Sequence, residues 1–274
     1  MTATGAASSA LREEIAGLDW YHTLALAPGV TTPGWFDLRK MAPLVGLPES
    51  LAGKRCLDVG TFDGFWAFEM EGRGAAEVVA IDILEPLEWD WPAGSEEATI
   101  AAIGKRKARG AGFEIARREL RSSVRRLELS VYDLDPQEVG HFDVVYLGSL
   151  LLHLRDPIGA LARVRTVCNG MMIVCDAIDA PLTALFRRRP VVELDAVGRP
   201  WWWKPNLAAL VRMLQAAGFE PLAPPVRLRM PPGPGHPSPQ WRARWLLTHS
   251  GRVETMRAWH GDPHAIVKAR PAVG

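Results

Sequence analysis

The sequence has few cysteines, and their positions do not indicate a disulfide framework or a metal site. Only Cys56, Cys168 and Cys175 occur in 274 residues, without the close paired spacing of cysteine metal ligands. Two of them fall in apolar runs of strand length, so we interpret all three as small buried hydrophobic residues in a reducing compartment. The sequence therefore predicts neither a metal centre nor an iron–sulfur radical enzyme.

Long apolar runs and an excess of either charge are also missing. Every apolar run is of strand length, and residues 1–10 lack the basic start and apolar centre of a secretory signal. The 32 basic residues are balanced by 31 acidic residues, so charge gives no overall reason to expect a nucleic acid or a membrane as partner. We expect a cytoplasmic protein without membrane association.

The residues that are present indicate an α/β fold. Hydrophobic residues make up 48% of the chain, which is enough to bury one large core. Residues 54–64 read K-R-C-L-D-V-G-T-F-D-G, in which an apolar run breaks at Gly60 and Gly64 before a helix-like F-W-A-F. A strand, a glycine turn and a helix form the opening unit of a doubly wound sheet, whose ligands bind at the carboxyl ends of the strands. This turn is the expected binding site.

The turn is acidic, which argues against a dinucleotide. A dinucleotide-binding turn has the spacing G-x-G-x-x-G and no nearby anion, because backbone N–H groups must meet phosphate oxygens. Here the spacing is G-x-x-x-G between Asp58 and Asp63, and Asp82 lies in the next predicted strand, residues 77–83. A carboxylate at that position can bind both ribose hydroxyls. Three carboxylates suit a cationic nucleoside, and S-adenosylmethionine carries the sulfonium, ammonium and ribose that they would bind.

The run L-D-V-G-T-F-D-G together with Asp82 resembles motifs I and II of class I S-adenosylmethionine-dependent methyltransferases. The resemblance implies a Rossmann-like, seven-stranded α/β sheet with an N-terminal lid and a C-terminal antiparallel hairpin. It implies an N-terminal helix and lid at residues 1–50, a methyltransferase domain at 51–250 and a C-terminal tail at 251–274. Residues 179–204 form an expected insertion on the substrate side. A purely structural strand-to-helix turn is the alternative interpretation.

Hydrophobic periodicity predicts the remaining elements. A helix is expected from Leu207, with apolar residues at helical spacing and Gly218 as its end. The closing hairpin joins two strands through a segment rich in proline and glycine. The expected strands after the first two are residues 126–133, 142–149, 171–178, 219–230 and 242–248.

The resemblance also implies roles around the cofactor. Asp58 and Asp63 would hold the methionine ammonium directly or through water, and Asp82 would bind the ribose. Tyr132 and Asp133 would border the adenine, and Gly148 would lie against the sulfonium. The expected cofactor contacts are Asp58, Gly60, Thr61, Phe62, Asp63, Asp82, Ile83, Tyr132, Asp133, Gly148 and Ser149.

Methyl transfer from a sulfonium is an in-line displacement, so alignment and exclusion of water are the main tasks of the protein. An oxygen or nitrogen acceptor that begins protonated also needs a base near pH 7, for which histidine is the usual choice. His153, just after the fourth strand, is the first candidate, and His22 on the lid is the second; either can instead be structural. The candidates for an acceptor wall, with ordinary packing as the alternative, are Tyr21, Trp35, Trp201 and Trp203.

Several motifs spread over residues 20–220 resemble a narrower group, the tRNA wobble-uridine 5-oxyacetate (mo5U34) methyltransferase-like proteins. They are W-Y-H, T-P-G-W-F-D, L-D-V-G-T-F-D-G-F-W, L-x-H-L-x-D-P and W-W-K-P-N. The resemblance implies that the tRNA enzyme uses a carboxylated S-adenosylmethionine, whose extra carboxylate needs basic partners and a tyrosine at the position of Leu152. A leucine cannot donate a hydrogen bond, and a buried unpaired anion is costly. We therefore expect plain S-adenosylmethionine, with S-adenosylhomocysteine as product, and a small-molecule acceptor.

Two other functions stay open at this point. A tRNA wobble-uridine modifying enzyme would use the basic run at residues 105–126, which is otherwise interpreted as an amphipathic helix with a solvated face. A non-catalytic protein would bind S-adenosylmethionine and turn over no acceptor. The sequence does not fix the acceptor, the atom methylated or the oligomeric state.

Overall fold

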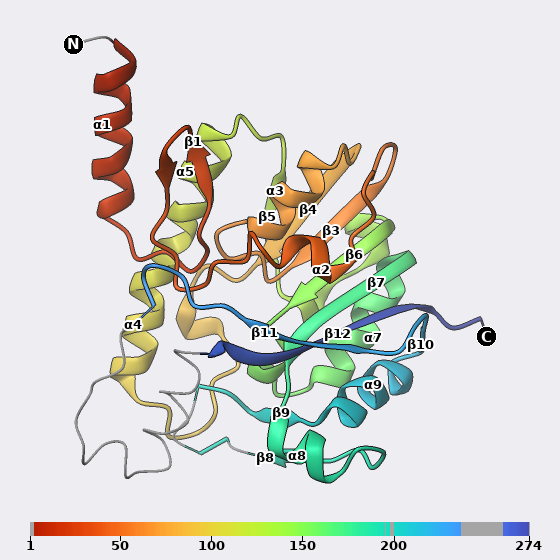
Figure 1. The fold of residues 1–274 in the computed structure, drawn as a ribbon. Helices are drawn as coiled ribbons and strands as arrows, with labels where there is room; N and C mark the ends of the chain where they lie inside the picture. Colours follow the sequence, from red (N-terminus) through yellow and green to blue (C-terminus); the bar gives the residue numbers. More distant parts are fainter. Residues whose placement is uncertain (1–2, 195, 198–199, 237–259, 274) are drawn as a thin grey trace.

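The structure, a computed structural model, describes residues 3–194, 196–197, 200–236 and 260–273. One large mixed sheet runs through the molecule (Figure 1). Its strand order is β10-β12-β7-β6-β3-β4-β5, and β11 also pairs with β12. The strands are β3 (Arg55–Val59), β4 (Glu77–Asp82), β5 (Arg125–Glu128), β6 (Phe142–Gly148), β7 (Cys168–Ala177), β10 (Phe219–Pro221), β11 (Val226–Met230) and β12 (Asp262–Pro271).

The pairing confirms the predicted doubly wound α/β fold with an antiparallel closing part. Strands β3 to β7 pair in parallel, whereas β12 is antiparallel to β7, β10 and β11. Consecutive residues of β3 are apolar, so both of its faces carry side chains that need to be covered. Cys56 packs in one hydrophobic core and Leu57 in the other, on the opposite face.

The C-terminal part of the sheet corrects the prediction in two places. The predicted strand at residues 219–230 is two strands, because Pro224 and Pro225 lie between β10 and β11 and lack the N–H that a ladder needs. The described part of the sheet therefore has eight strands instead of seven. β12 lies in the segment predicted to be a C-terminal tail, and it is the partner of both β10 and β11. The predicted strand at 242–248 falls outside the described residues.

Helices cover both faces of the sheet. The first core contains residues of α1 (Ala3–Ala16), α2 (Ala42–Val45), α3 (Phe65–Gly72) and α5 (Ala111–Glu119). The second contains residues of α6 (Pro136–Val139), α7 (Pro157–Val167) and α9 (Leu207–Ala216). All three cysteines are buried and free, as the sequence indicated. Within the described residues, no helix combines the length and apolar character needed to cross a membrane.

The N-terminal segment is held on both sides by backbone hydrogen bonds. After a small hairpin of β1 (Ala25–Ala27) and β2 (Val30–Thr31), the amide of Phe36 donates to the carbonyl of Tyr21 at 2.9 Å. On its other side the amide of Gly235 donates to the carbonyl of Gly34, also at 2.9 Å. Gly34 is required here because a Cβ would lie 2.1 Å from the His22 carbonyl carbon. The N-terminal segment is therefore folded on itself and bound to the backbone at Gly235.

Two further segments differ from the expectation. β5 ends at Glu128, and residues Val131–Asp133 form a 3₁₀ helix, η3, so the strand predicted at 126–133 is shorter. The segment 179–204 is more regular than a loop insertion. It contains α8 (Ala180–Leu185), and β8 (Val192–Leu194) pairs with β9 (Trp203–Pro205). Asn206 caps α9 by accepting the amide of Ala209 at 2.8 Å.

Candidate active site

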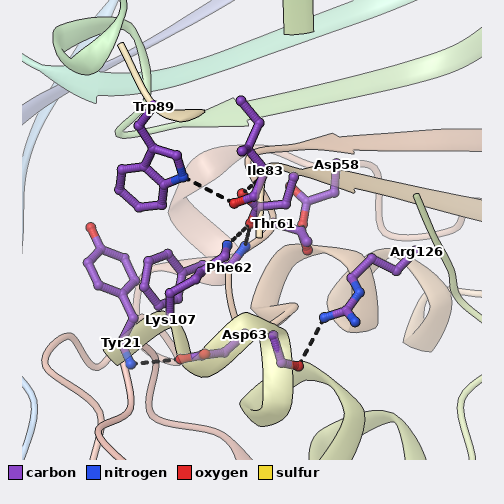
Figure 2. A network of polar contacts seen from close by, with 11 residues as sticks. Tyr21, Asp58, Thr61, Phe62, Asp63, Ile83, Trp89, Lys107 and Arg126 are labelled. Carbon is purple, nitrogen blue, oxygen red and sulfur yellow. Dashed lines mark hydrogen bonds and ion pairs between the residues drawn. The ribbon is translucent and has the colours of Figure 1, made fainter. Parts of the chain in front are cut away.

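A cavity of about 1270 Å³ lies at the carboxyl ends of β3, β4, β6 and β7. It is at least as large as typical ligand sites, which measure roughly 300–1,000 Å³. Its floor is the glycine turn after β3, and the N-terminal segment covers it through Tyr21, His22, Trp35 and Phe36. Figure 2 shows the turn and the polar contacts that hold it. The predicted binding site and the observed cavity therefore coincide.

The glycine turn exposes backbone and one carboxylate to the cavity. Gly60 and Gly64 have φ angles of +76° and +90°, which glycine adopts without strain. Asp58 lines the cavity and accepts hydrogen bonds from the Thr61 hydroxyl at 2.7 Å and the Ala67 amide at 3.1 Å. Burial raises the pKa of Asp58 to about 7. Asp58 is thus near its titration point at neutral pH and can bind an ammonium group once it is ionised.

Asp82 lies at the end of β4, as predicted, and is held from several sides. Its carboxylate accepts the amides of Phe62 at 2.7 Å and Ile83 at 2.8 Å. It also forms an ion pair with Lys107, whose side chain is 1% exposed. This contact of Lys107 was not predicted, because Lys107 belongs to the basic run that was interpreted as a solvated face. The cavity-lining carboxylate is therefore fixed in place by two amides and one buried ammonium.

Asp63, predicted to hold the methionine ammonium directly or through water, lies outside the cavity wall. Its carboxylate accepts the amides of Tyr21 at 2.7 Å and His22 at 2.9 Å. Burial raises the pKa of Asp63 to about 6, against the opposing effect of the two amides. Asp63 therefore ties the N-terminal segment to the glycine turn instead of meeting the cofactor directly.

Of the two residues predicted to border the adenine, one lies in the cavity wall. Tyr132 lines the cavity, and its hydroxyl donates to Asp90 at 2.7 Å. Asp90 also accepts the Arg155 amide at 2.8 Å, which joins the loop after β4 to the loop after β6. Asp133 is exposed and lies outside the cavity wall, because η3 turns it away, so its predicted contact is not supported.

The other predicted cofactor contacts lie in the cavity wall. Ile83 follows Asp82, and its carbonyl accepts the indole N–H of Trp89 at 3.1 Å (Figure 2). Gly148 ends β6 and Ser149 follows it. The predicted contacts that line the cavity are Asp58, Gly60, Thr61, Phe62, Asp82, Ile83, Tyr132, Gly148 and Ser149.

Both predicted histidines line the cavity, but their environments differ. The Nδ1 atom of His153 lies 2.7 Å from the Pro200 carbonyl oxygen, which can only accept, so Nδ1 carries the proton. Burial lowers the pKa of His153. Burial lowers the pKa of His22 to about 3, so His22 is a weak base at neutral pH. Of the two, His153 fits the predicted base better.

The predicted acceptor wall is present in part. Tyr21, Trp35 and Trp201 line the cavity, whereas Trp203 does not, because its indole N–H donates to the Arg155 carbonyl at 3.1 Å. Arg106, expected on the solvated basic face, also lines the cavity, with its guanidinium carbon 3.6 Å from the centre of the Trp35 ring. The basic run is therefore not one outer face.

Comparison with known proteins identifies the family. A family described as "Methyltransferase domain" matches residues 37–223. The chain belongs to this family of methyltransferases. The match confirms the predicted family, the enzyme class of the domain and S-adenosylmethionine as its cofactor. Asp58, Gly60 and Asp82 in the cavity wall fit this cofactor, because they offer the carboxylates and the open backbone that its ammonium and ribose require.

The curated relatives modify tRNA. The chain is 28% identical over 193 residues to the tRNA U34 carboxymethyltransferase of Dichelobacter nodosus, covering 68% of this chain and 52% of the relative. It is 30% identical over 174 residues to the enzyme of the same name from Ectopseudomonas mendocina, covering 62% and 46%. The chain spans about half the length of the curated relatives it matches.

Solved structures share the fold. The N-terminal domain of EvdMO1 with S-adenosylhomocysteine bound aligns with a TM-score of 0.55 at 16% identity, covering 100% of this chain and 98% of that one. Magnesium protoporphyrin IX methyltransferase from Synechocystis PCC 6803, also with S-adenosylhomocysteine bound, aligns with a TM-score of 0.50 at 14% identity, covering 86% and 82%. At these identities the likeness concerns the fold alone.

Proposed function

We propose that this protein transfers a methyl group from S-adenosylmethionine to an oxygen or nitrogen of a small-molecule acceptor. The observation that carries the proposal is that Leu152, the residue before His153 in the sequence, lines the cavity. A carboxylated cofactor needs a hydrogen-bond donor at this position, and a leucine side chain has none. A buried carboxylate that lacks this hydrogen bond would be less stable, so the plain cofactor fits this part of the wall better.

The residues of the cavity wall would have different roles in such a reaction. Asp58 would hold the methionine ammonium, Asp82 the ribose hydroxyls, and Tyr132 would border the adenine. The N-terminal segment, fixed by Asp63, would exclude water from the methyl group. Alignment of the acceptor with the sulfonium supplies most of the acceleration, because proximity alone contributes on the order of 7–11 kcal/mol.

The charge distribution also favours a small acceptor over tRNA. In the basic run, Arg118 pairs with Glu14 at 2.6 Å and Arg117 pairs with Glu114 at 2.9 Å. Arg126 also pairs with Glu114, at 2.9 Å. Such exposed pairs add little stability, but the acids reduce the positive charge that a phosphate backbone would meet.

The second candidate is a carboxymethyl transferase acting on a tRNA wobble uridine. The tRNA U34 carboxymethyltransferases among the relatives favour it. Under this candidate, the protein would bind tRNA with an affinity that falls steeply with salt, and it would prefer the carboxylated cofactor.

Transfer assays distinguish the two. The purified protein is incubated with methyl-labelled S-adenosylmethionine, or with labelled carboxy-S-adenosylmethionine, in the presence of unmodified tRNA or of a panel of small alcohols, phenols and amines. We expect label in small-molecule products and none in tRNA. A carboxymethyl group on the wobble uridine would overturn the proposal, and cofactor binding without transfer to any acceptor would favour a non-catalytic protein.

A further inference from the structure

A serine and a histidine form a hydrogen-bonded pair in the cavity wall. Ser149 follows β6 with a φ of +51°, a left-handed conformation that is unfavourable for serine. Its hydroxyl oxygen lies 3.0 Å from Nε2 of His264, which belongs to β12, and both residues line the cavity. The sequence analysis missed His264 because β12 falls in the predicted tail.

The backbone fixes which nitrogen of His264 is the base. Nδ1 lies 3.0 Å from the Asp262 carbonyl oxygen, and a carbonyl can only accept. Nδ1 therefore carries the proton of the neutral ring, and Nε2 accepts the hydrogen bond of the Ser149 hydroxyl. This is the arrangement by which a histidine activates a hydroxyl group.

The carboxylate of Asp176 lies near the pair. His264 is 3% exposed, and Asp176 on β7 interacts electrostatically with it. The Asp176 carboxylate accepts the amides of Leu150 and Leu151, each at 2.8 Å, which keeps it beside the start of the loop after β6. A nearby carboxylate stabilises the imidazolium that forms when a histidine takes up a proton. The Tyr21 hydroxyl interacts with Ser149 from the N-terminal segment.

We infer that His264, acting through the Ser149 hydroxyl, is the general base of the reaction and that the acceptor is a hydroxyl compound. The inference rests on the proposed function. The acceptor oxygen forms a bond to the methyl carbon as the carbon–sulfur bond breaks and leaves its electron pair on sulfur. The acceptor proton passes to the Ser149 oxygen, while the Ser149 proton passes to Nε2 of His264.

The pair fits a hydroxyl acceptor better than an amine. A phenol or alcohol keeps its proton at neutral pH, since a tyrosine hydroxyl has a pKa near 10, and it must lose that proton as the new bond forms. An amine attacks through its lone pair and can release its proton afterwards. The Ser149 hydroxyl donates its hydrogen bond to His264 and can accept one from the hydroxyl group of the methyl acceptor. It can therefore take up the proton that a phenol or alcohol loses as the new bond forms.

A chromogenic phenol tests the inference without knowledge of the natural acceptor. Calorimetry first establishes S-adenosylhomocysteine binding for the wild type and for His264→Gln, Ser149→Ala, His153→Gln and His141→Gln. His153→Gln tests the rival base, and His141→Gln, an exposed histidine outside the cavity wall, is the matched control. Each protein, saturated with S-adenosylhomocysteine, is then titrated with 4-nitrophenol at a pH below the pKa of the free phenol. The visible absorbance of the phenolate reports proton transfer from the bound probe.

We expect a phenolate band with the wild type and with His141→Gln, and its loss with His264→Gln and Ser149→Ala. With a hydroxyl acceptor from the transfer panel, His264→Gln should lower kcat by ~10²–10⁴-fold, the usual contribution of a general base. A band that persists in His264→Gln, a band lost in His153→Gln instead, or transfer to amines alone would overturn the inference. Absence of S-adenosylhomocysteine binding by the wild type would instead refute the proposed function.

Discussion

The ion pair between Lys107 and Asp82 is expected to be the strongest electrostatic coupling at the candidate site. Its side chains are 1% and 11% exposed, so both charges are largely removed from water. Asp82→Asn removes the ion-pair partner of the buried Lys107 ammonium, a defect that costs about 3–5 kcal/mol. Lys107→Met costs less, about 1–3 kcal/mol, because Asp82 keeps the amides of Phe62 and Ile83 and faces the cavity.

The double variant removes both charges at once. A neutral pair of similar volume is often tolerated, so its cost should be about 1 kcal/mol, well below the sum of the single variants. The coupling energy is then at least about 3 kcal/mol. The exposed pair Arg270–Glu220, with both side chains 54% exposed, serves as the matched control and should couple by no more than about 1 kcal/mol.

Urea unfolding followed by tryptophan fluorescence measures all four proteins of each cycle without any cofactor. A two-state transition and a common slope of about 1–3 kcal/mol per molar urea are required for the comparison. Additive single variants at Lys107 and Asp82, or a coupling no larger than that of Arg270–Glu220, would refute the reasoning that this buried pair holds the carboxylate in place.

Three further predictions concern single residues. Because the pKa of Asp58 is about 7, Asp58 ionises between about pH 6 and about pH 8, and the affinity for S-adenosylmethionine should rise by up to about tenfold over this range. Calorimetry should show that this rise is abolished in Asp58→Asn. Asp63→Leu leaves the amides of Tyr21 and His22 without an acceptor, which costs about 1–3 kcal/mol for each amide. The variant should therefore have a lower urea midpoint and a lower affinity for S-adenosylhomocysteine. Unchanged values would contradict the role of Asp63 in fixing the N-terminal segment. Gly34→Ala should unfold at a much lower temperature than the wild type, because the added methyl group clashes with the His22 backbone. The control Gly72→Ala, in α3 and with open space around it, should be neutral or stabilising by up to about 1 kcal/mol.

Local patterns in the sequence were sufficient for the fold and for the floor of the site. The glycine turn, Asp58 and Asp82 were predictable because each depends on a strand end and the residues that follow it. Tyr132 was predictable for the same reason. Asp133, its neighbour, was not, because the short helix η3 replaces the end of the expected strand and turns this carboxylate to solvent.

Features that depend on contacts distant in sequence were not predictable. Lys107 and Arg106 were grouped with a basic outer face, but α4 (Glu97–Lys107) ends at Lys107, and the left-handed residues Ala108 and Arg109 separate it from α5. The two helices therefore present their basic residues to different surroundings. His264 was missed because β12 joins the sheet through pairing with β7, and its short apolar run carries no strong local signal.

Cofactor preference is the most direct test of the proposed function, because it does not require the acceptor. Calorimetric titration compares S-adenosylmethionine, S-adenosylhomocysteine and carboxy-S-adenosylmethionine, with Asp133→Ala as a control for Asp82→Ala. We predict tight binding of the first two, weaker binding of the carboxylated form, loss of binding for Asp82→Ala and retention for Asp133→Ala. A preference for carboxy-S-adenosylmethionine would contradict the role given to Leu152 and support the tRNA reaction of the relatives instead.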